Sequence, residues 1–176
     1  MTKVEVTKYE VKKGNSLSLL EEKTVVDYCI LHRKEPVCSA ILILLYSGMR
    51  VGELVSAVLH ENYIECETEK IRKGKAKEIR KIPISPMLKR VMQYIDFEAA
   101  KTVKRDYINR RFQKIIQGRH THELRYTFIT RAKECGCNLE LVMLWDGHKF
   151  DKEVVTSAVD RGYTTYSDGY YFKEIE

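Results

Sequence analysis

The sequence predicts a mainly α-helical domain with a small antiparallel β-sheet, an α+β fold. Apolar residues recur at helical spacing through most of the 176 residues, whereas residues 62–69 and 78–85 have the character of two paired strands. A hydrophobic content of 44% is enough for one domain with a substantial core. We therefore expect one domain over residues 16–176, preceded by a polar lead-in strand or linker over residues 1–15.

The chain is predicted to begin with two helices. Residues 16–33 carry apolar side chains at helical spacing, with Ser18 as the candidate N-cap. Pro36 opens a second helix, which is apolar on nearly all sides and therefore buried, and Gly48 ends it. Residues 50–59 are predicted to form a further short helix.

A β-hairpin with a basic tip is predicted next. Its two strands flank the sequence KIRKGKAK, which is rich in lysine and arginine. Pro86 then starts another helix that runs to residue 97. Three more helices are predicted: one over residues 103–118, one after Thr121 as N-cap and one after Asn138 as N-cap. The aromatic-rich tail, residues 151–176, is expected to end in a short helix.

The net charge suits a polyanionic partner. The 31 lysines and arginines exceed the 25 acidic residues, which gives a charge of +6 and an isoelectric point near 9.0. Such an excess is typical of proteins that bind DNA or RNA, but it is also found on well-solvated surfaces that bind nothing charged. Charge alone therefore leaves both interpretations open.

The five cysteines have no spacing that fits a disulfide framework or a zinc site, so we expect reduced thiols and a reducing compartment. The longest apolar run, AILILLY, is far too short to span a membrane, and no signal peptide opens the chain. We therefore expect a cytoplasmic protein.

Several residues could carry chemistry, although each also has an ordinary structural role. Arg50 could cap a helix or pair with Glu53, and His122 could be a capping or surface residue. His122 and Arg125 are three residues apart at the start of a predicted helix, so they share one face of it. His148 could be a C-terminal helix residue that is helped by the helix dipole.

Taken together, these residues form a chemical set. Cleavage of a DNA phosphodiester without a metal needs a nucleophile, positive charge around the non-bridging oxygens and an acid for the leaving oxygen. Arginine binds phosphate through two parallel hydrogen bonds and keeps its charge. Lysine or histidine can protonate a departing alkoxide, and tyrosine can attack phosphorus and hold it covalently.

The order of the motifs resembles that of the tyrosine recombinases, the phage integrase family, over nearly all of the chain from Ser16 onward. YSGMRVGEL resembles the family's first arginine box, and KGKAKEIRKIPI resembles the hairpin that carries its lysine. THELRY resembles the His-x-x-Arg box, WDGH the box of the second histidine, and YTTYS the tyrosine box. The resemblance implies the tyrosine recombinase catalytic-domain fold. The residues that match the family's catalytic positions are Arg50, Lys75, His122, Arg125, His148 and Tyr163.

Three positions leave alternatives open. Lys73 is the rival of Lys75, and Lys77 is a more distant candidate. Tyr166 is the rival of Tyr163, because the segment after His148 is longer than in many members of the family. The third position is Asp146, where the family usually has an apolar residue. A buried unpaired carboxylate would be costly there, so we expect Asp146 to be exposed or paired, with Lys149 or Arg131 as candidate partners.

The resemblance implies an enzyme that cuts and rejoins double-stranded DNA at attachment sites through a 3′-phosphotyrosyl intermediate, without metal or other cofactor. It implies a phage, prophage or mobile element in a bacterial host, action at the nucleoid, and a tetramer on DNA that associates weakly or is monomeric alone. It also implies that residues 1–15 lead in from a separate N-terminal DNA-binding domain. The alternatives are a non-catalytic DNA-binding module of the same fold and a relative of type IB topoisomerases.

Overall fold

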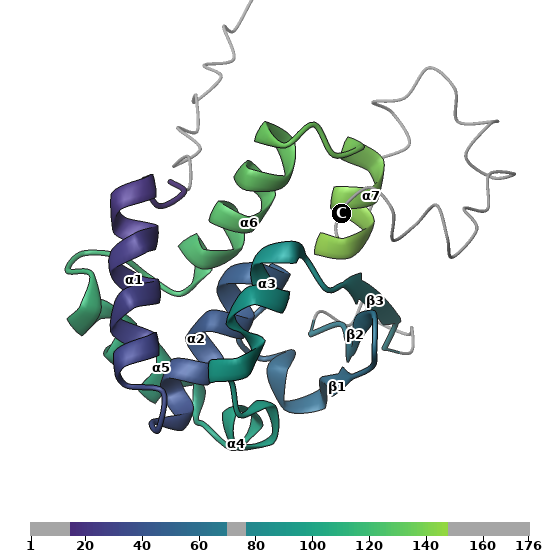
Figure 1. The fold of residues 1–176 in the computed structure, drawn as a ribbon. Helices are drawn as coiled ribbons and strands as arrows, with labels where there is room; N and C mark the ends of the chain where they lie inside the picture. Colours follow the sequence, from purple (N-terminus) through teal and green to yellow (C-terminus); the bar gives the residue numbers. More distant parts are fainter. Residues whose placement is uncertain (1–14, 70–76, 148–176) are drawn as a thin grey trace, which may run out of the picture.

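The computed structural model describes residues 15–69 and 77–147 of the chain. Over these residues it consists of helices packed around one another, with a small sheet at one edge (Figure 1). The helices are α1 (Leu19–Leu31), α2 (Pro36–Ser47), α3 (Pro86–Val91), α4 (Phe97–Lys101), α5 (Arg105–Ile115), α6 (His122–Glu134) and α7 (Leu139–Asp146). The 3-10 turns are η1 (Leu54–Ser56) and η2 (Met92–Tyr94), and the strands are β1 (Val58–Leu59), β2 (Tyr63–Glu67) and β3 (Ile79–Pro83). The predicted α+β class is confirmed.

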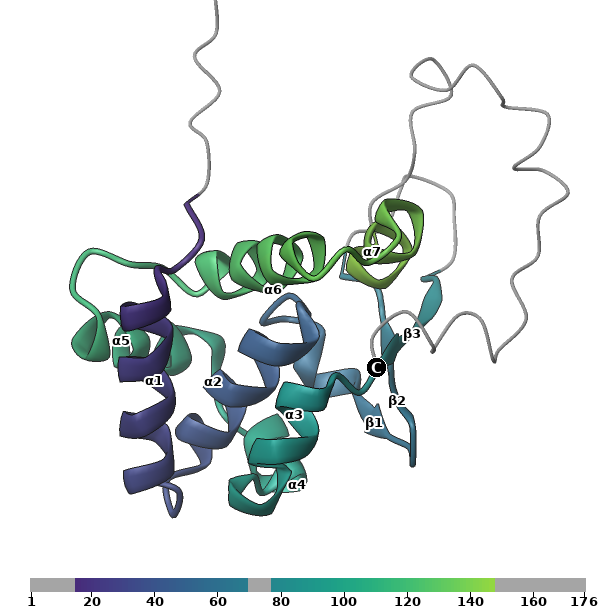
Figure 2. The ribbon, with the colours of Figure 1, turned by 45° about the horizontal axis from the view of Figure 1, so that its top comes forward.

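Helix α2 is the centre of the core. Every residue from Val37 to Ser47 is buried, as expected for a helix that is apolar on all sides. It contacts α1, α3, α4, α5 and α6, and Figure 2 shows α6 lying across it. The rest of the fold is therefore held in place around this helix, whose C-terminal end leads directly to Arg50.

Gly48 fixes the close approach of α2 and α6. It is the C-cap of α2 and has a left-handed backbone with φ of 66°. A Cβ atom at this position would lie 2.4 Å from Cδ1 of Phe128 on α6. The position therefore needs glycine both for its backbone and for its space.

The sheet is antiparallel with the strand order β1-β2-β3. Its alternation places Ile64 and Cys66 of β2 on the buried face together with Arg80 and Ile82 of β3, and Cys66 is paired with Arg80. Helix α7 packs against β3 (Figure 1). An arginine is thus directed into the interior between the sheet and α7.

The predicted helix ends are largely confirmed. Ser18 and Glu21 form a capping box at the start of α1, Pro36 opens α2, and the Asn138 side chain caps α7. None of the five cysteines, which all lie in the described ranges, forms a disulfide bond. None of the helices in the described ranges is long and apolar enough to cross a membrane.

Two predicted helices are wrong. Residues 50–59 form a turn, η1 and strand β1, because the Glu53 side chain accepts a hydrogen bond from the Arg50 amide and Val58–Leu59 pair with β2. The helix predicted over residues 86–97 is broken, because Asp96 caps a separate helix, α4, through the amide of Ala99. The lead-in segment up to residue 14 and the predicted last helix lie outside the described residues.

Candidate active site

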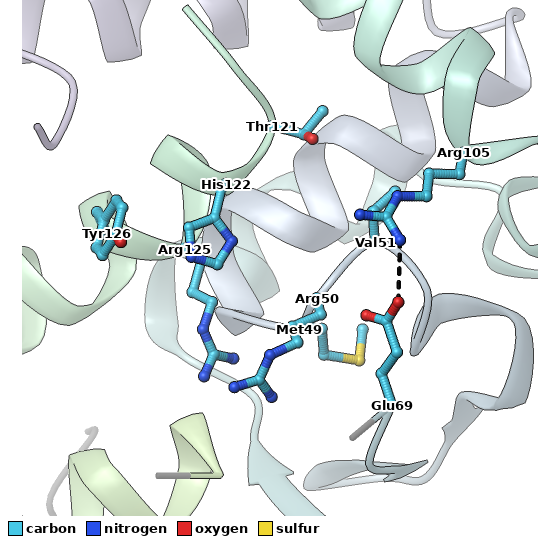
Figure 3. A pocket seen from close by; sticks show the side chains of 9 residues that line it. All are labelled: Met49, Arg50, Val51, Glu69, Arg105, Thr121, His122, Arg125 and Tyr126. Carbon is cyan, nitrogen blue, oxygen red and sulfur yellow. Dashed lines mark hydrogen bonds and ion pairs between the residues drawn. The ribbon is translucent and has the colours of Figure 1, made fainter. Parts of the chain in front are cut away.

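A cleft of about 630 Å³ brings together three of the predicted catalytic residues (Figure 3). Its walls come from the loop after α2, the segment just after β2 and the N-terminal turns of α5 and α6. The guanidinium groups of Arg50 and Arg125 turn toward the same part of the cleft (Figure 3). The lining residues are Met49, Arg50, Val51, Glu69, Arg105, Thr121, His122, Arg125 and Tyr126.

His122 is the first residue of α6 and lies at the wall of the cleft. Its ring meets the ring of Tyr126 edge-on, with the centroids 4.9 Å apart. Thr121 occupies the predicted N-cap position, but its side chain contacts Asn109 at 3.5 Å instead of capping the helix. The amides of Glu123 and Leu124 instead donate to the backbone carbonyl oxygens of His120 and Thr121. The start of α6, with the positive end of its helix dipole, lies at the cleft.

Arg125 is almost fully buried, with 2% of its side chain exposed. Its Nη1 donates to the carbonyl oxygen of Gly48 at 2.7 Å. Its Nη2 donates to the carbonyl oxygen of Asp146 and forms an ion pair with the Asp146 carboxylate. One guanidinium thus joins the start of α6 to the end of α2 and the end of α7.

Arg50 is held by Glu53, so the ordinary interpretation of this pair is also correct. The Glu53 carboxylate accepts from the Arg50 amide at 2.8 Å and from Arg50 Nη1 at 3.1 Å. The carboxylate is fully buried, while the Arg50 side chain remains 14% exposed at the cleft. Glu53 therefore fixes an arginine that can still reach a ligand.

Arg80 is the main residue of this site that the sequence analysis did not assign. Its Nη2 pairs with Glu53 at 2.5 Å, and its Nη1 donates to the carbonyl oxygen of Asp146 at 2.9 Å. Gly147, with φ of 70°, lies so close that a Cβ there would be 2.1 Å from Arg80 Nη1. Arg80 and Ile82 alternate with exposed residues along β3, and this pattern in the sequence could have indicated a buried arginine.

The buried network carries an excess of positive charge. Three guanidinium groups, those of Arg50, Arg80 and Arg125, meet the two carboxylates of Glu53 and Asp146. Burial lowers the pKa of Arg125 to about 9, with further lowering by the charges of Arg50 and Arg80. An anion in the cleft would offset this unfavourable charge, so the site is suited to bind one.

A second ion pair crosses the cleft. Glu69, just after β2, accepts a hydrogen bond from Arg105 Nη1 of α5 at 2.9 Å (Figure 3). The Glu69 carboxyl group lies over Gly52, where a Cβ would be 2.7 Å from it. A carboxylate at this wall was not anticipated from the sequence.

The partner predicted for Asp146 is corrected by the structure. Asp146 is buried and paired as expected, but the pairing residue is Arg125 and not Arg131. Arg131 is held elsewhere, by Glu22 at 2.8 Å and by Glu134 at 2.8 Å. Lys149, the other candidate, lies outside the described residues.

Three of the six predicted catalytic residues lie outside the residues that the structure describes. Lys75 with its rival Lys73, His148, and Tyr163 with its rival Tyr166 all lie in residues 70–76 or 148–176. Lys77 is described; it is exposed and paired with Glu67 at 2.8 Å. In the described ranges, no group of His, Cys, Asp and Glu side chains could hold a metal ion.

Comparison with solved structures identifies the fold. The Tn1549 transposon integrase in complex with circular intermediate DNA matches with a TM-score of 0.52 and 17% identity, over 96% of this chain and 67% of that one. XerA recombinase matches with a TM-score of 0.60 and 22% identity, over 85% of this chain and 64% of that one. XerH site-specific recombinase, bound to difH DNA after cleavage, matches with a TM-score of 0.51 and 14% identity, over 85% and 52%.

The chain therefore has the fold of a tyrosine recombinase catalytic domain, as its motifs imply. At these identities the likeness establishes the fold alone. The chain spans between about half and two thirds of the length of these solved proteins. No protein-family model matches the sequence, and the search of curated proteins finds no match.

Proposed function

We propose that the chain is the catalytic domain of a tyrosine site-specific recombinase that cuts and rejoins DNA. The observation that carries the proposal is the cleft in which Arg50, His122 and Arg125 come together at the N-terminus of α6. These residues come from separate segments of the chain, and they meet in a domain with the recombinase fold. An arginine pair beside the N-terminus of α6 suits a phosphodiester, because both the guanidinium groups and the positive end of the helix dipole attract an anion.

The described residues account for binding and charge stabilisation. Arg50 and the part of Arg125 that faces the cleft would donate hydrogen bonds to the non-bridging oxygens of the scissile phosphate. The charge on these oxygens increases in the transition state, so fixed donors at this place would accelerate the reaction. His122, on the same wall, would hydrogen-bond a phosphate oxygen or assist proton transfer.

The remaining roles are proposed from the sequence. The Tyr163 hydroxyl oxygen would attack phosphorus and form a 3′-phosphotyrosyl bond, while the bond from phosphorus to the 5′ oxygen breaks. Lys75 would give a proton to that leaving 5′ oxygen, and His148 would hydrogen-bond a phosphate oxygen. A 5′-hydroxyl of a partner strand would then displace the tyrosine, which reseals the strand without metal or nucleotide.

The partners and setting follow from the same proposal. The Tn1549 integrase and XerH are solved with DNA, and we propose double-stranded DNA attachment sites as the substrate here. The proposal includes a tetramer on DNA and a separate N-terminal DNA-binding domain. It also includes action at the nucleoid of a bacterial host, for a phage, prophage or mobile element. The transposon integrase among the neighbours supports the mobile element.

A second candidate function is a DNA-binding module that does not cleave. It is favoured by the acidic side chains at the cleft, since Glu69 pairs with Arg105 and Asp146 with Arg125. A carboxylate beside an arginine weakens the binding of the scissile phosphate by that arginine, and cleavage depends on this binding. A topoisomerase-like enzyme would share the same chemistry but would not depend on a specific site.

Covalent trapping distinguishes these functions. The full chain is incubated with nicked duplexes of random sequence, and DNA that stays attached in denaturing gels is amplified and sequenced. The proposal predicts an adduct that Tyr163→Phe abolishes and Tyr166→Phe preserves, with enrichment of one sequence. Loss with Tyr166→Phe alone would reassign the nucleophile, adducts without sequence enrichment would favour the topoisomerase, and DNA binding without any adduct would favour the non-cleaving module.

A further inference from the structure

The contact between Asp146 and Arg125 places an acidic group directly beside an arginine of the proposed phosphate site. Asp146 is the last residue of α7 and is 1% exposed. Its carboxylate pairs with Nη2 of Arg125. The same arginine donates to the Gly48 carbonyl at the end of α2 and lines the cleft. A side chain that only filled space at this position would not need a charge, and burial of a charge is costly unless it is compensated.

Arg125 does not depend on this carboxylate for its position. Two backbone carbonyl groups, those of Gly48 and Asp146, already accept hydrogen bonds from its two terminal nitrogens. Arg80 holds the Asp146 carbonyl from the other side at 2.9 Å. If the carboxylate moved away, these backbone contacts would therefore keep the guanidinium in place.

The guanidinium also has donors beyond these contacts. Within the described residues, Arg125 donates hydrogen bonds to two carbonyl oxygens and forms an ion pair with the Asp146 carboxylate, whereas a guanidinium has five N–H donors. The carboxylate of Asp146 is planar and an incoming phosphate is tetrahedral, but both present negatively charged oxygens that guanidinium N–H groups bind. They would compete for the same positive charge.

We propose that Asp146 is a resident counter-anion of Arg125, which the DNA phosphate must displace or outweigh, and that it thereby sets the phosphate affinity of the cleft. The inference rests on the proposed function, because it assumes that the ligand of the cleft is a phosphodiester. It assigns to Asp146 a regulating role in place of the space-filling role of an apolar residue. In the absence of DNA, Asp146 offsets the charge of Arg125. With DNA bound, it opposes the phosphate.

Phosphate titration of the full chain tests this role. Asp146→Asn keeps the size and an acceptor oxygen but removes the charge, and Asp146→Leu provides a second uncharged variant of similar volume if the first does not fold. Asp27→Asn is the matched control, because it removes one negative charge from an exposed pair with Lys23 on α1. The probe is inorganic phosphate in a low-chloride buffer, with affinity measured by calorimetry and by the rise in melting temperature.

The proposal predicts that Asp146→Asn binds phosphate about tenfold more tightly than the wild type, with Asp27→Asn unchanged. It also predicts that Asp146→Asn is less stable than the wild type without phosphate and regains stability as phosphate is added. Equal or weaker phosphate binding by the Asp146 variants would overturn the inference.

A separate variant shows whether the proposed function has failed as well. If Arg50→Gln weakens phosphate binding while the Asp146 variants equal the wild type, the phosphate site stands and only the inference is wrong. If phosphate binds to none of these proteins, the cleft is not a phosphate site and the proposed function and the inference both fail.

Discussion

Glu53 is the residue whose replacement should damage this site most. Its carboxylate is fully buried and accepts hydrogen bonds from Arg80 Nη2 at 2.5 Å, from Arg50 Nη1 at 3.1 Å and from the Arg50 amide at 2.8 Å. Glu53→Gln leaves one acceptor oxygen and turns the other into an NH₂ group that faces guanidinium donors. Two buried or nearly buried cations would then lack their shared anion.

Removal of one partner of a buried ion pair costs about 3–5 kcal/mol, and the remaining amide oxygen places Glu53→Gln near the lower end, about 3 kcal/mol. In a chain of this size that loss lowers the melting temperature by about 6–12 °C. Urea unfolding at neutral pH measures the loss in the free energy of unfolding, and thermal unfolding measures the fall in melting temperature.

Glu67→Gln is the matched control, because it removes the same charge from the neighbouring strand β2. Its pair with Lys77 is about half exposed on both sides, so the loss should stay below about 1 kcal/mol. If Glu53→Gln cost no more than Glu67→Gln, the buried network would not hold the arginines as described, and the positioning of Arg50 would need another cause.

Two further predictions concern the fold around the site. Gly48→Ala should lose at least about 3 kcal/mol, because its new Cβ would meet Phe128, whereas Gly136→Ala should lose only about 1 kcal/mol, since its φ of 78° is similar but nothing lies within 4 Å. Equal losses in urea unfolding would contradict the steric explanation. Hydrogen bonds from Arg119 and then from the Ser18 amide lower the pKa of Glu21 to about 2. Glu21→Gln should therefore cost about 1 kcal/mol at neutral pH, and the difference from the wild type should shrink as the pH falls from about 4.5 toward about 2. A difference that did not change with pH would mean that this ion pair adds no stability.

Much of the fold could be predicted because the local signals agree with the tertiary structure. Pro36, Gly48 and Asn138 mark helix ends through backbone geometry and capping, which depend on few neighbours. The all-apolar helix α2 could only be the centre of the core. The helix predicted over residues 50–59 failed because a side chain, Glu53, and a partner strand, β2, compete for its backbone.

The site was predictable only in part, for a physical reason. Arg50, His122 and Arg125 could be assigned because their motif spacing and order resemble those of a known family. The alternation along β3 could indicate that Arg80 is buried, but its partners and the true partner of Asp146 depend on how β3, α6 and α7 pack together, and no local pattern encodes that packing. The same local periodicity is compatible with several packings, so charge pairs between distant segments need the three-dimensional structure.

The central claim is that this cleft performs phosphoryl transfer on DNA, and the rate of adduct formation by Arg50→Gln tests it most directly. Single-turnover reactions on the DNA recovered by covalent trapping would compare the wild type, Arg50→Gln and Arg110→Gln, an arginine on α5 whose Nε donates to the Asp106 carbonyl at 3.3 Å, outside the cleft. The account predicts a rate at least about 100-fold lower for Arg50→Gln and a nearly unchanged rate for Arg110→Gln. A folded Arg50→Gln protein that forms the adduct at the wild-type rate would contradict it.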